Sequence, residues 1–481
     1  MSKRNWKIVY SSYCGIQKKA IELIYKEMGA LILRDKGRYT IHVLACEKEK
    51  QAIIDKNAVV IGLYNESEII KKYITADEIK ENGYVVKVMD NPENTDLKLV
   101  LITANTEAAL FYGAVDFVDD YFALAAPKHG GLLLVDNVFL EKLPDYYISA
   151  APAIKTRSVF TWGNPINDYR NYIDNMARLK LNQLIIWNDF VPLNADDIVD
   201  YAHSYGIQVI WGFAWGWSRQ CVTTDLNNLD ALTESVLKTY NENYKNLKGD
   251  GIYFQSFTET WEGKTDIDGK SIAEVVVGFV NNIAGKILAE KPDLSIQFGL
   301  HAMSVKDKLE FIAKTDSRVE IMWEDCGTFP YHYDPEIKDQ KAYADTLEFT
   351  DKILELRNKG KVSMLVKGFM TLDWVGDNFV HQAGPYILGD AKSSIIKHDK
   401  QILTPIWRRF QAGWLENGKY AYNVINHIHK NRQDATIGMA GQFAGGMWFP
   451  EALCAQMLFE ADEPYEEILK KVLNRRSVDI V

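Results

Sequence analysis

The chain has little that would cross-link it or anchor it in a membrane. Its 481 residues include only five cysteines, an odd number, and these are scattered without metal-ligand spacing or a disulfide framework. Its apolar stretches, such as Leu132–Val135, fall far short of the roughly 20 residues that a membrane-spanning helix needs. We therefore expect reduced thiols and no membrane partner.

Basic residues are also in deficit. The formal net charge is −10 at pH 7, and no local cluster of lysine and arginine compensates for it. Because an acidic surface repels phosphate groups, we expect no nucleic-acid partner. The segment Met1–Tyr10 carries basic residues without a following apolar region, so no secretory signal is visible. This favours a cytoplasmic protein, although a secreted protein with a trimmed leader would look the same.

Residues 1–139 alternate between short strand-like and helical patterns. Lys7–Tyr10, Ala58–Leu63 and Leu97–Ala104 are rich in apolar and β-branched residues, which is typical of strands. Thr106–Phe122 has the apolar spacing of an amphipathic helix and begins at a capping residue. This alternation predicts a small α/β sandwich domain. Leu140–Thr156 contains two prolines and has no clear period, so we place a linker at 140–156.

From residue 157 to 459 the pattern becomes a regular alternation of an apolar run, a loop and a helix. Eight such units are the number that closes a (β/α)8 barrel, and near-continuous apolar runs fit a parallel sheet that is buried on both faces. No glycine-rich nucleotide loop follows any run, which disfavours an open doubly wound sheet. A further helix is expected within 460–481. The predicted strands are Ser158–Trp162, Gln183–Asn188, Gln208–Phe213, Gly251–Phe254, Ser295–Leu300, Val319–Trp323, Ser363–Phe369 and Thr436–Met439.

Tryptophan is unusually abundant and recurs at the ends of these runs. Of eight predicted strands, seven have a tryptophan within several residues of their end. Residues that follow barrel strands lie at the C-terminal end of the barrel, where barrel enzymes bind ligands. Flat aromatic rings stack on the C–H faces of sugar rings, while polar neighbours pair with hydroxyl groups. The sequence therefore predicts a sugar-binding rim made of Trp162, Asn188, Trp215, Trp217, Trp261, His301, Trp323, Tyr331, Trp374 and Trp448.

Carboxylates follow the predicted strands in the same way. Cleavage of an acetal needs one protonated carboxyl group and one ionised carboxylate. Glu259 is the best candidate for the acid, because Phe257 and Trp261 flank it and would keep water away. The residues do not separate Glu324 from Asp325 as its partner. The catalytic candidates are Glu259 after the fourth strand, Glu324 and Asp325 after the sixth, and Asp373 after the seventh.

Other chemistries have weaker patterns. His301 stands alone after a strand, and the nearest histidine pair, His427 and His429, is two residues apart in a helical pattern, so its rings would point to different sides. No Gly-x-Ser-x-Gly motif is present, and Cys326 has no evident base beside it. We expect neither a metal ion nor another cofactor.

Four short segments carry a resemblance to known families. Ala58–Gly62, Gly83–Val88 and Glu107–Phe117 resemble the small α/β domain that precedes the barrel in family-67 α-glucuronidases and family-20 β-hexosaminidases. Arg157-Ser158-Val159-Phe160 is similar to the Arg-Gly strand that opens the barrel in those families, with Ser158 in place of the glycine. The resemblance implies that Arg157 binds sugar hydroxyls.

The two families imply different substrates. Family-20 enzymes have an Asp-Glu pair after strand 4, and Thr258-Glu259 stands there in this chain, which disfavours cleavage assisted by an acetamido group. The family-67 arrangement has an acid after strand 4 and carboxylates after strands 6 and 7, which fits this chain better. A glucuronate carboxylate would need a cation, and Arg157, Arg219 and Lys367 are available.

The sequence thus predicts a glycosidase that acts on an oligosaccharide or glycoside through a carboxylate pair. A substrate-assisted β-N-acetylhexosaminidase and a non-catalytic carbohydrate-binding barrel are the alternatives. A homodimer is left open.

Overall fold

The computed structural model describes residues 5–33, 44–50, 53, 55–125, 143–161, 163, 166–188, 190–216, 228–256, 266–301, 305–326, 340–369, 384–390, 392–441 and 446–481. Contacts within the chain divide it into two compact units. The first comprises Met1–Pro152, Ser204–Gly206 and Glu466–Asp479, and the second comprises Ala153–His203, Ile207–Tyr465 and Ile480–Val481.

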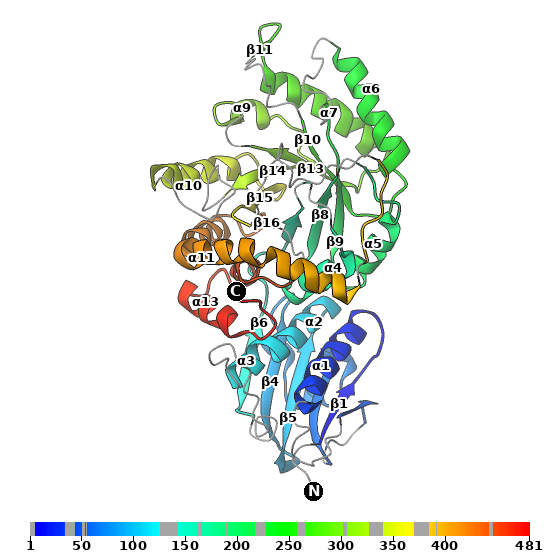
Figure 1. Ribbon diagram of the computed structural model, residues 1–481, viewed down its shortest axis with the longest axis vertical. Helices are drawn as coiled ribbons and strands as arrows, with labels where there is room; N and C mark the ends of the chain where they lie inside the picture. The colour runs from blue at the N-terminus through cyan, green and yellow to red at the C-terminus, as the bar shows by residue number, and fades with distance from the viewer. Residues whose placement is uncertain are drawn as a thin grey trace. The chain divides into compact units, whose positions relative to one another are not determined.

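The first unit is built on a mixed six-stranded sheet with the order β2-β1-β3-β5-β4-β6 (Figure 1). Strands β1, β2, β3 and β5 are parallel, whereas β4 is antiparallel to both β5 and β6. The predicted linker at 140–156 is wrong for Tyr146–Ala150, because these residues form the edge strand β6. The other strands are β1 (Trp6–Tyr10), β2 (Leu44–Lys48), β3 (Asn57–Leu63), β4 (Tyr84–Asn91) and β5 (Asn94–Ala104).

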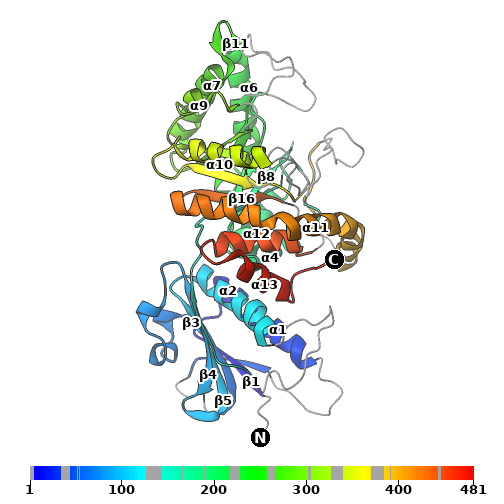
Figure 2. The same ribbon diagram turned by 90° about the vertical axis from the view of Figure 1, so that its left-hand side faces the viewer.

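Both faces of this sheet are covered. Helices α1 (Gly15–Leu33) and α2 (Glu107–Val115) contact each other and lie along one face (Figure 2). On the other face, short 3₁₀ turns within residues 64–78 bring Ile70 and Ile74 against Val60 and Val85 in one buried cluster. The predicted α/β sandwich is confirmed.

Helix α2 continues as the π-helix η4 (Asp116–Tyr121) and ends in α3 (Phe122–Ala125). The wider π turn buries three aspartates of this unit, Asp116, Asp119 and Asp120. Asp116 accepts hydrogen bonds from the hydroxyl groups of Tyr84 (2.8 Å) and Tyr146 (3.0 Å). The carboxylate of Asp120 forms two contacts with the guanidinium of Arg475, at 2.5 and 2.9 Å. Arg475 directly follows α13 (Tyr465–Asn474), the predicted C-terminal helix, and the segment Glu466–Asp479 is part of the first unit.

The second unit is a closed barrel of eight parallel strands in the order β10-β13-β14-β15-β16-β7-β8-β9 (Figure 1). Each of these strands overlaps one of the predicted apolar runs, so the predicted (β/α)8 barrel is confirmed. The strands are β7 (Arg157–Phe160), β8 (Gln183–Trp187), β9 (Gln208–Gly212), β10 (Gly251–Gln255), β13 (Ser295–Leu300), β14 (Val319–Cys326), β15 (Val362–Val366) and β16 (Thr436–Ala440).

Helices connect the strands and surround the barrel. Helix α7 is long and apolar enough to cross a membrane by length and composition alone. Its residues Val276, Val280, Ile283 and Ile287 are nevertheless buried along one side, as in a core helix of a barrel. The helices are α4 (Tyr169–Arg178), α5 (Ala195–His203), α6 (Leu229–Thr239) with η6 (Tyr240–Tyr244), α7 (Ile272–Glu290), α9 (Leu309–Ile312), α10 (Gln340–Leu354), α11 (Ser393–Asn431) and α12 (Phe449–Phe459). A short hairpin of β11 (Asp266–Ile267) and β12 (Lys270–Ser271) precedes α7.

The barrel interior is layered. Near the N-terminal ends of the strands, the amide nitrogen of Gln297 lies 3.2 Å from the Gln183 side-chain oxygen and 3.4 Å from the Glu320 carboxylate. Above this polar layer lies an apolar cluster, which comprises Phe160, Ile185, Trp187, Ile210, Tyr253, Met322, Leu365 and Ala440. Because side chains alternate along a strand, Glu320, Met322 and Glu324 of β14 all face inward.

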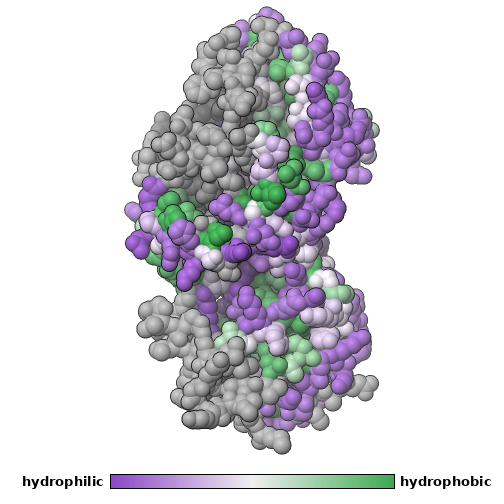
Figure 3. Space-filling view, turned by 45° about the vertical axis from the view of Figure 1, so that its right-hand side comes forward, coloured by the Kyte–Doolittle hydropathy of each residue, from purple (hydrophilic) through white to green (hydrophobic). Residues whose placement is uncertain are grey.

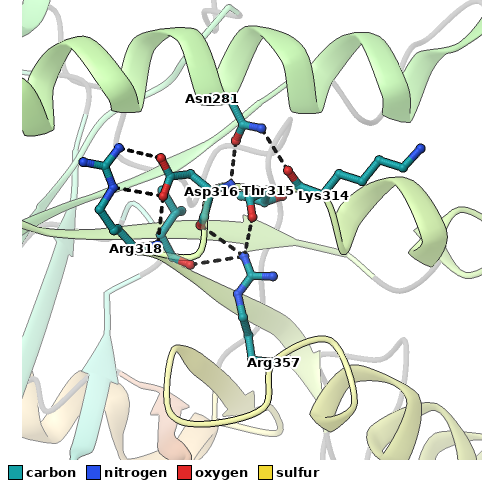
Figure 4. A network of polar contacts seen from close by, with 7 residues as sticks. Asn281, Lys314, Thr315, Asp316, Arg318 and Arg357 are labelled. Carbon is teal, nitrogen blue, oxygen red and sulfur yellow. Dashed lines mark hydrogen bonds and ion pairs between the residues drawn. The ribbon is translucent and has the colours of Figure 1, made fainter.

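A polar network fixes the turn that precedes β14 (Figure 4). Asn281 of α7 accepts a hydrogen bond from the backbone of Asp316 (2.7 Å), whose carboxylate in turn pairs with Arg318 (2.6 Å). The guanidinium of Arg357 donates to the carbonyl groups of Ala313 and Thr315. The network lies at the N-terminal end of the barrel, where residues of such barrels serve stability.

Hydrophilic residues predominate over the described part of the face in Figure 3, and hydrophobic residues form smaller patches.

Candidate active site

Three polar side chains meet at the C-terminal ends of neighbouring barrel strands. Gln255 ends β10, His301 directly follows β13, and Glu324 lies near the end of β14. The Nε2 atom of His301 lies 2.7 Å from Oε2 of Glu324, and the amide of Gln255 donates to the same oxygen. The Glu324 side chain is fully buried, whereas that of His301 is 23% exposed. The carboxylate therefore lies beneath the imidazole, which is the more accessible group.

A glycine provides the space for this carboxylate. A Cβ atom at Gly299 would lie 1.8 Å from Oε1 of Glu324 and 2.0 Å from the hydroxyl of Tyr253. Real Cβ atoms essentially never approach other atoms closer than 3.0 Å, so only glycine fits beside these two groups. Gly299 could not be recognised from the sequence, because its importance depends on contacts with side chains of the neighbouring strands.

The floor beneath the cluster is aromatic and excludes water. The ring of Tyr253 packs edge-on against Trp187 at 5.3 Å and lies 4.8 Å from Phe160. All three rings are buried. A buried carboxylate is tolerated only when it is paired and hydrogen-bonded, and His301 and Gln255 supply these contacts to Glu324.

A second group of rim residues joins the loop after β8 to the segment before α11. The Asn188 amide donates to the Tyr386 hydroxyl at 2.5 Å, and the backbone nitrogen of Leu193 donates to the Tyr386 carbonyl at 2.7 Å. The Asn194 side chain both donates to and accepts from the backbone of Leu388, at 3.0 Å each. Tyr386 was missed in the sequence, because nothing near it in the chain indicates this contact.

The role implied for Arg157 is not supported by its position. Arg157 begins β7, so it lies at the N-terminal end of the barrel, away from the end that carries Glu324. Its guanidinium is buried and donates to the backbone carbonyls of Lys180 (2.7 Å), Ile154 (2.6 Å) and Lys155 (3.0 Å). These contacts are structural and leave Arg157 no access to a sugar at the C-terminal end.

Three of the predicted rim tryptophans serve packing instead. Trp215 is stacked on Phe254 with a centroid distance of 3.5 Å, and Trp323 meets Phe349 of α10 edge-on at 4.9 Å. Trp448 is stacked on Trp407 of α11 at 5.4 Å. All three tryptophan side chains are fully buried, so their prediction as sugar-stacking residues is wrong. Trp323 neighbours the inward-facing Glu324 and for that reason faces the surrounding helices.

Several candidates lie outside the described residues. These are the carboxylates Glu259 and Asp373, the aromatic residues Trp162, Trp217, Trp261, Tyr331 and Trp374, and the cation Arg219. Asp325 belongs to β14, but its side chain also lies outside the described part. The pairing of Glu259 with a second carboxylate therefore stays a prediction.

The two histidines of the pair on α11 point to different sides, as their spacing predicts. His427 contacts Asp351 at 2.6 Å, and His429 contacts Asp462 at 3.0 Å. The two rings thus face different partners. Within the described ranges, no three side chains of histidine, cysteine, aspartate or glutamate form a group suited to a metal ion.

Comparison with known proteins finds solved structures that align with this chain. No protein-family model and no curated protein matches the chain. The solved structure of CpGH84B aligns with 98% of this chain and 70% of its own, with a TM-score of 0.51 and 12% sequence identity. CpGH84D aligns over 98% and 68% of the two chains, with a TM-score of 0.46 and 12% identity.

A third structure is that of a GH138 enzyme targeting pectin rhamnogalacturonan II. It aligns over 96% of this chain but 51% of its own, with a TM-score of 0.46 and 11% identity. At 12% identity the likeness to CpGH84B concerns the fold alone, which in this chain is a (β/α)8 barrel with an α/β domain before it. The resemblance to families 67 and 20 is not confirmed by these comparisons.

Proposed function

We propose that this protein is a glycoside hydrolase that cleaves an O-glycosidic bond at the C-terminal end of its barrel. The observation that carries the proposal is the cluster of Gln255, His301 and Glu324, which places a buried carboxylate and an accessible imidazole at that end. Barrel enzymes carry out their chemistry at this end. The likeness in fold to CpGH84B supports the same class.

In the proposed mechanism Glu259 is the general acid. It follows Gln255, the last residue of β10 and a member of the polar cluster, by four positions in the sequence. A second carboxylate acts as nucleophile or as base for water. Because Glu324 is fully buried and engaged by His301 and Gln255, its environment favours another of the candidate carboxylates for that second role.

The test is a panel of 4-nitrophenyl glycosides of both anomeric configurations, including the N-acetylglucosaminide and the glucuronide. Release of nitrophenolate from at least one of them is expected. Glu259→Gln should then lower kcat by about 100-fold or more with little change in KM, the usual scale for loss of a general acid. Near-wild-type turnover by this variant would refute the role of Glu259.

The carbohydrate-binding alternative gives a different result. A binding barrel would release no nitrophenolate from any glycoside, yet an oligosaccharide panel would still bind, as measured by isothermal calorimetry. Hydrolysis of the N-acetylglucosaminide alone, with an N-thioacetyl analogue acting as inhibitor, would instead favour the substrate-assisted hexosaminidase.

A further inference from the structure

A catalytic carboxylate needs both a carboxyl group and access to the substrate, and Glu324 and His301 each supply one of these two properties. Glu324 has the carboxyl group but no exposed surface, whereas the imidazole of His301, which contacts it, is 23% exposed. A group that touches the substrate must be accessible from the C-terminal end of the barrel, which we call the barrel mouth. Of these two side chains, only the imidazole meets that condition in the structure.

We infer that Glu324 is a positioning residue, which holds His301 with its proton on Nε2 and its ring fixed toward the substrate. Gln255 is the second residue that holds the carboxylate in place. The inference rests on the proposed function only where it speaks of a substrate, because the proton position is a property of the protein alone.

The distances define where the proton lies. The Nε2 atoms of Gln255 and His301 are 3.1 Å apart, and each contacts Oε2 of Glu324. If the Gln255 amide donated to Nε2 of His301, that nitrogen would carry a lone pair, which would then face a carboxylate oxygen at 2.7 Å. Two N–H groups that share one acceptor oxygen avoid this repulsion. A neutral His301 therefore carries its proton on Nε2 and presents Nδ1 as an acceptor.

The surroundings keep the carboxylate from moving. One of its oxygens occupies the space beside Gly299, next to the buried hydroxyl of Tyr253. Tyr253 is itself packed against Trp187. A buried acceptor among fixed neighbours orients an imidazole more strictly than an exposed one does, since water does not compete for the hydrogen bond.

The chain contains a matched control for this pair. His427 and Asp351 have the same kind of contact at 2.6 Å, but their side chains are 32% and 49% exposed. Asp351→Asn therefore removes a histidine-bound carboxylate of similar geometry outside the barrel mouth. It should leave the state of His301 unchanged.

The first test reads the proton directly. Protein labelled with ¹⁵N at its nine histidines is studied by long-range ¹H–¹⁵N spectroscopy, and the His301 signals are assigned by their loss in His301→Gln. In the wild type at alkaline pH, Nε2 should be the protonated nitrogen. In Glu324→Met, which keeps the volume but removes both acceptors, the signal should shift toward a mixture of the two tautomers. Asp351→Asn should not shift it.

Two results would overturn the inference: a proton on Nδ1 in the wild type, or identical His301 signals in the wild type and Glu324→Met. The wild-type spectrum decides the proton position even if the methionine variant does not fold. The milder Glu324→Gln, which keeps one acceptor oxygen and loses the charge, supplies a second comparison.

The second test asks whether Glu324 acts through His301. On a glycoside that the wild type hydrolyses, His301→Gln and Glu324→Gln should each lower kcat/KM. The double variant should be less than about 2-fold worse than His301→Gln, because residues that act as a unit are not additive. Full multiplication of the two losses would contradict the inference. If no glycoside is hydrolysed, the proposed function fails while the spectroscopic result still stands.

Discussion

One methyl group added at Gly299 should disturb the barrel mouth more than its size suggests. The added Cβ would lie 1.8 Å from Oε1 of Glu324 and 2.0 Å from the hydroxyl of Tyr253. Both groups must move by about 1 Å or more before these contacts reach 3.0 Å. Neither is at the end of a freely moving chain, because Glu324 is held by His301 and the Tyr253 ring is buried.

The expected cost of Gly299→Ala is therefore that of an overpacked core, about 1–3 kcal/mol in the free energy of unfolding. The assay is urea denaturation, read together with the His301 signals. The free energy should fall, and those signals should shift, because the carboxylate that holds the ring is displaced.

Gly278→Ala is the matched control. Gly278 lies within α7, and an added Cβ would meet no atom within 4 Å. Alanine is favoured over glycine by roughly 0.5–1 kcal/mol inside a helix, so this variant should be slightly more stable than the wild type. Equal stability of Gly299→Ala and wild type, with unchanged His301 signals, would refute the described packing of the mouth.

Two further predictions concern stability. Arg475→Met leaves the buried Asp120 carboxylate without the two contacts that Arg475 makes, so the free energy of unfolding should fall by about 3–5 kcal/mol. Adding Asp120→Asn removes the charge and should make this loss smaller. Urea denaturation of the single and double variants checks the prediction, and equal losses in the two variants would contradict it. The hydrogen bond from Arg318 lowers the pKa of Asp316 below its ordinary value of 3.8, so this carboxylate stabilises the fold above that value and loses the effect as the pH falls through its folded pKa. Asp316→Asn should therefore destabilise the protein at neutral pH, and the difference from wild type should shrink on acidification; a constant difference in urea midpoints across pH would contradict this.

The barrel was predictable from local sequence. Each strand is a short apolar run, and the bounds predicted for Ser295–Leu300 agree with β13. A strand that is buried on both faces shows this pattern without any tertiary information. Tyr146–Ala150 has no such pattern, because an edge strand is half exposed and owes its conformation to pairing with β4.

Other parts of the site could be predicted only from the directions of strands and side chains, or not at all because they rest on contacts between residues far apart in the sequence. Trp323 and Glu324 are adjacent, so they cannot both face the barrel interior, and alternation along β14 could have assigned the tryptophan to the outer layer. Arg157 comes first in its strand, which already places it at the opposite end from a residue that follows a strand. The contact of Tyr386 with Asn188 joins residues 198 positions apart, and no local signal indicates it.

The central claim is that the chemistry takes place where Glu324 lies, at the C-terminal end of the barrel, and β14 offers a control on the same strand. Glu320 also faces the barrel interior and is buried, but it lies near the N-terminal end beside Gln297. The measurement is kcat/KM on a hydrolysed nitrophenyl glycoside for Glu324→Gln and Glu320→Gln. Misplacing a group at the reacting centre can cost about 100-fold, so a loss of this order is predicted for Glu324→Gln and little change for Glu320→Gln. Equal activity of the two variants, or the larger loss in Glu320→Gln, would contradict the account.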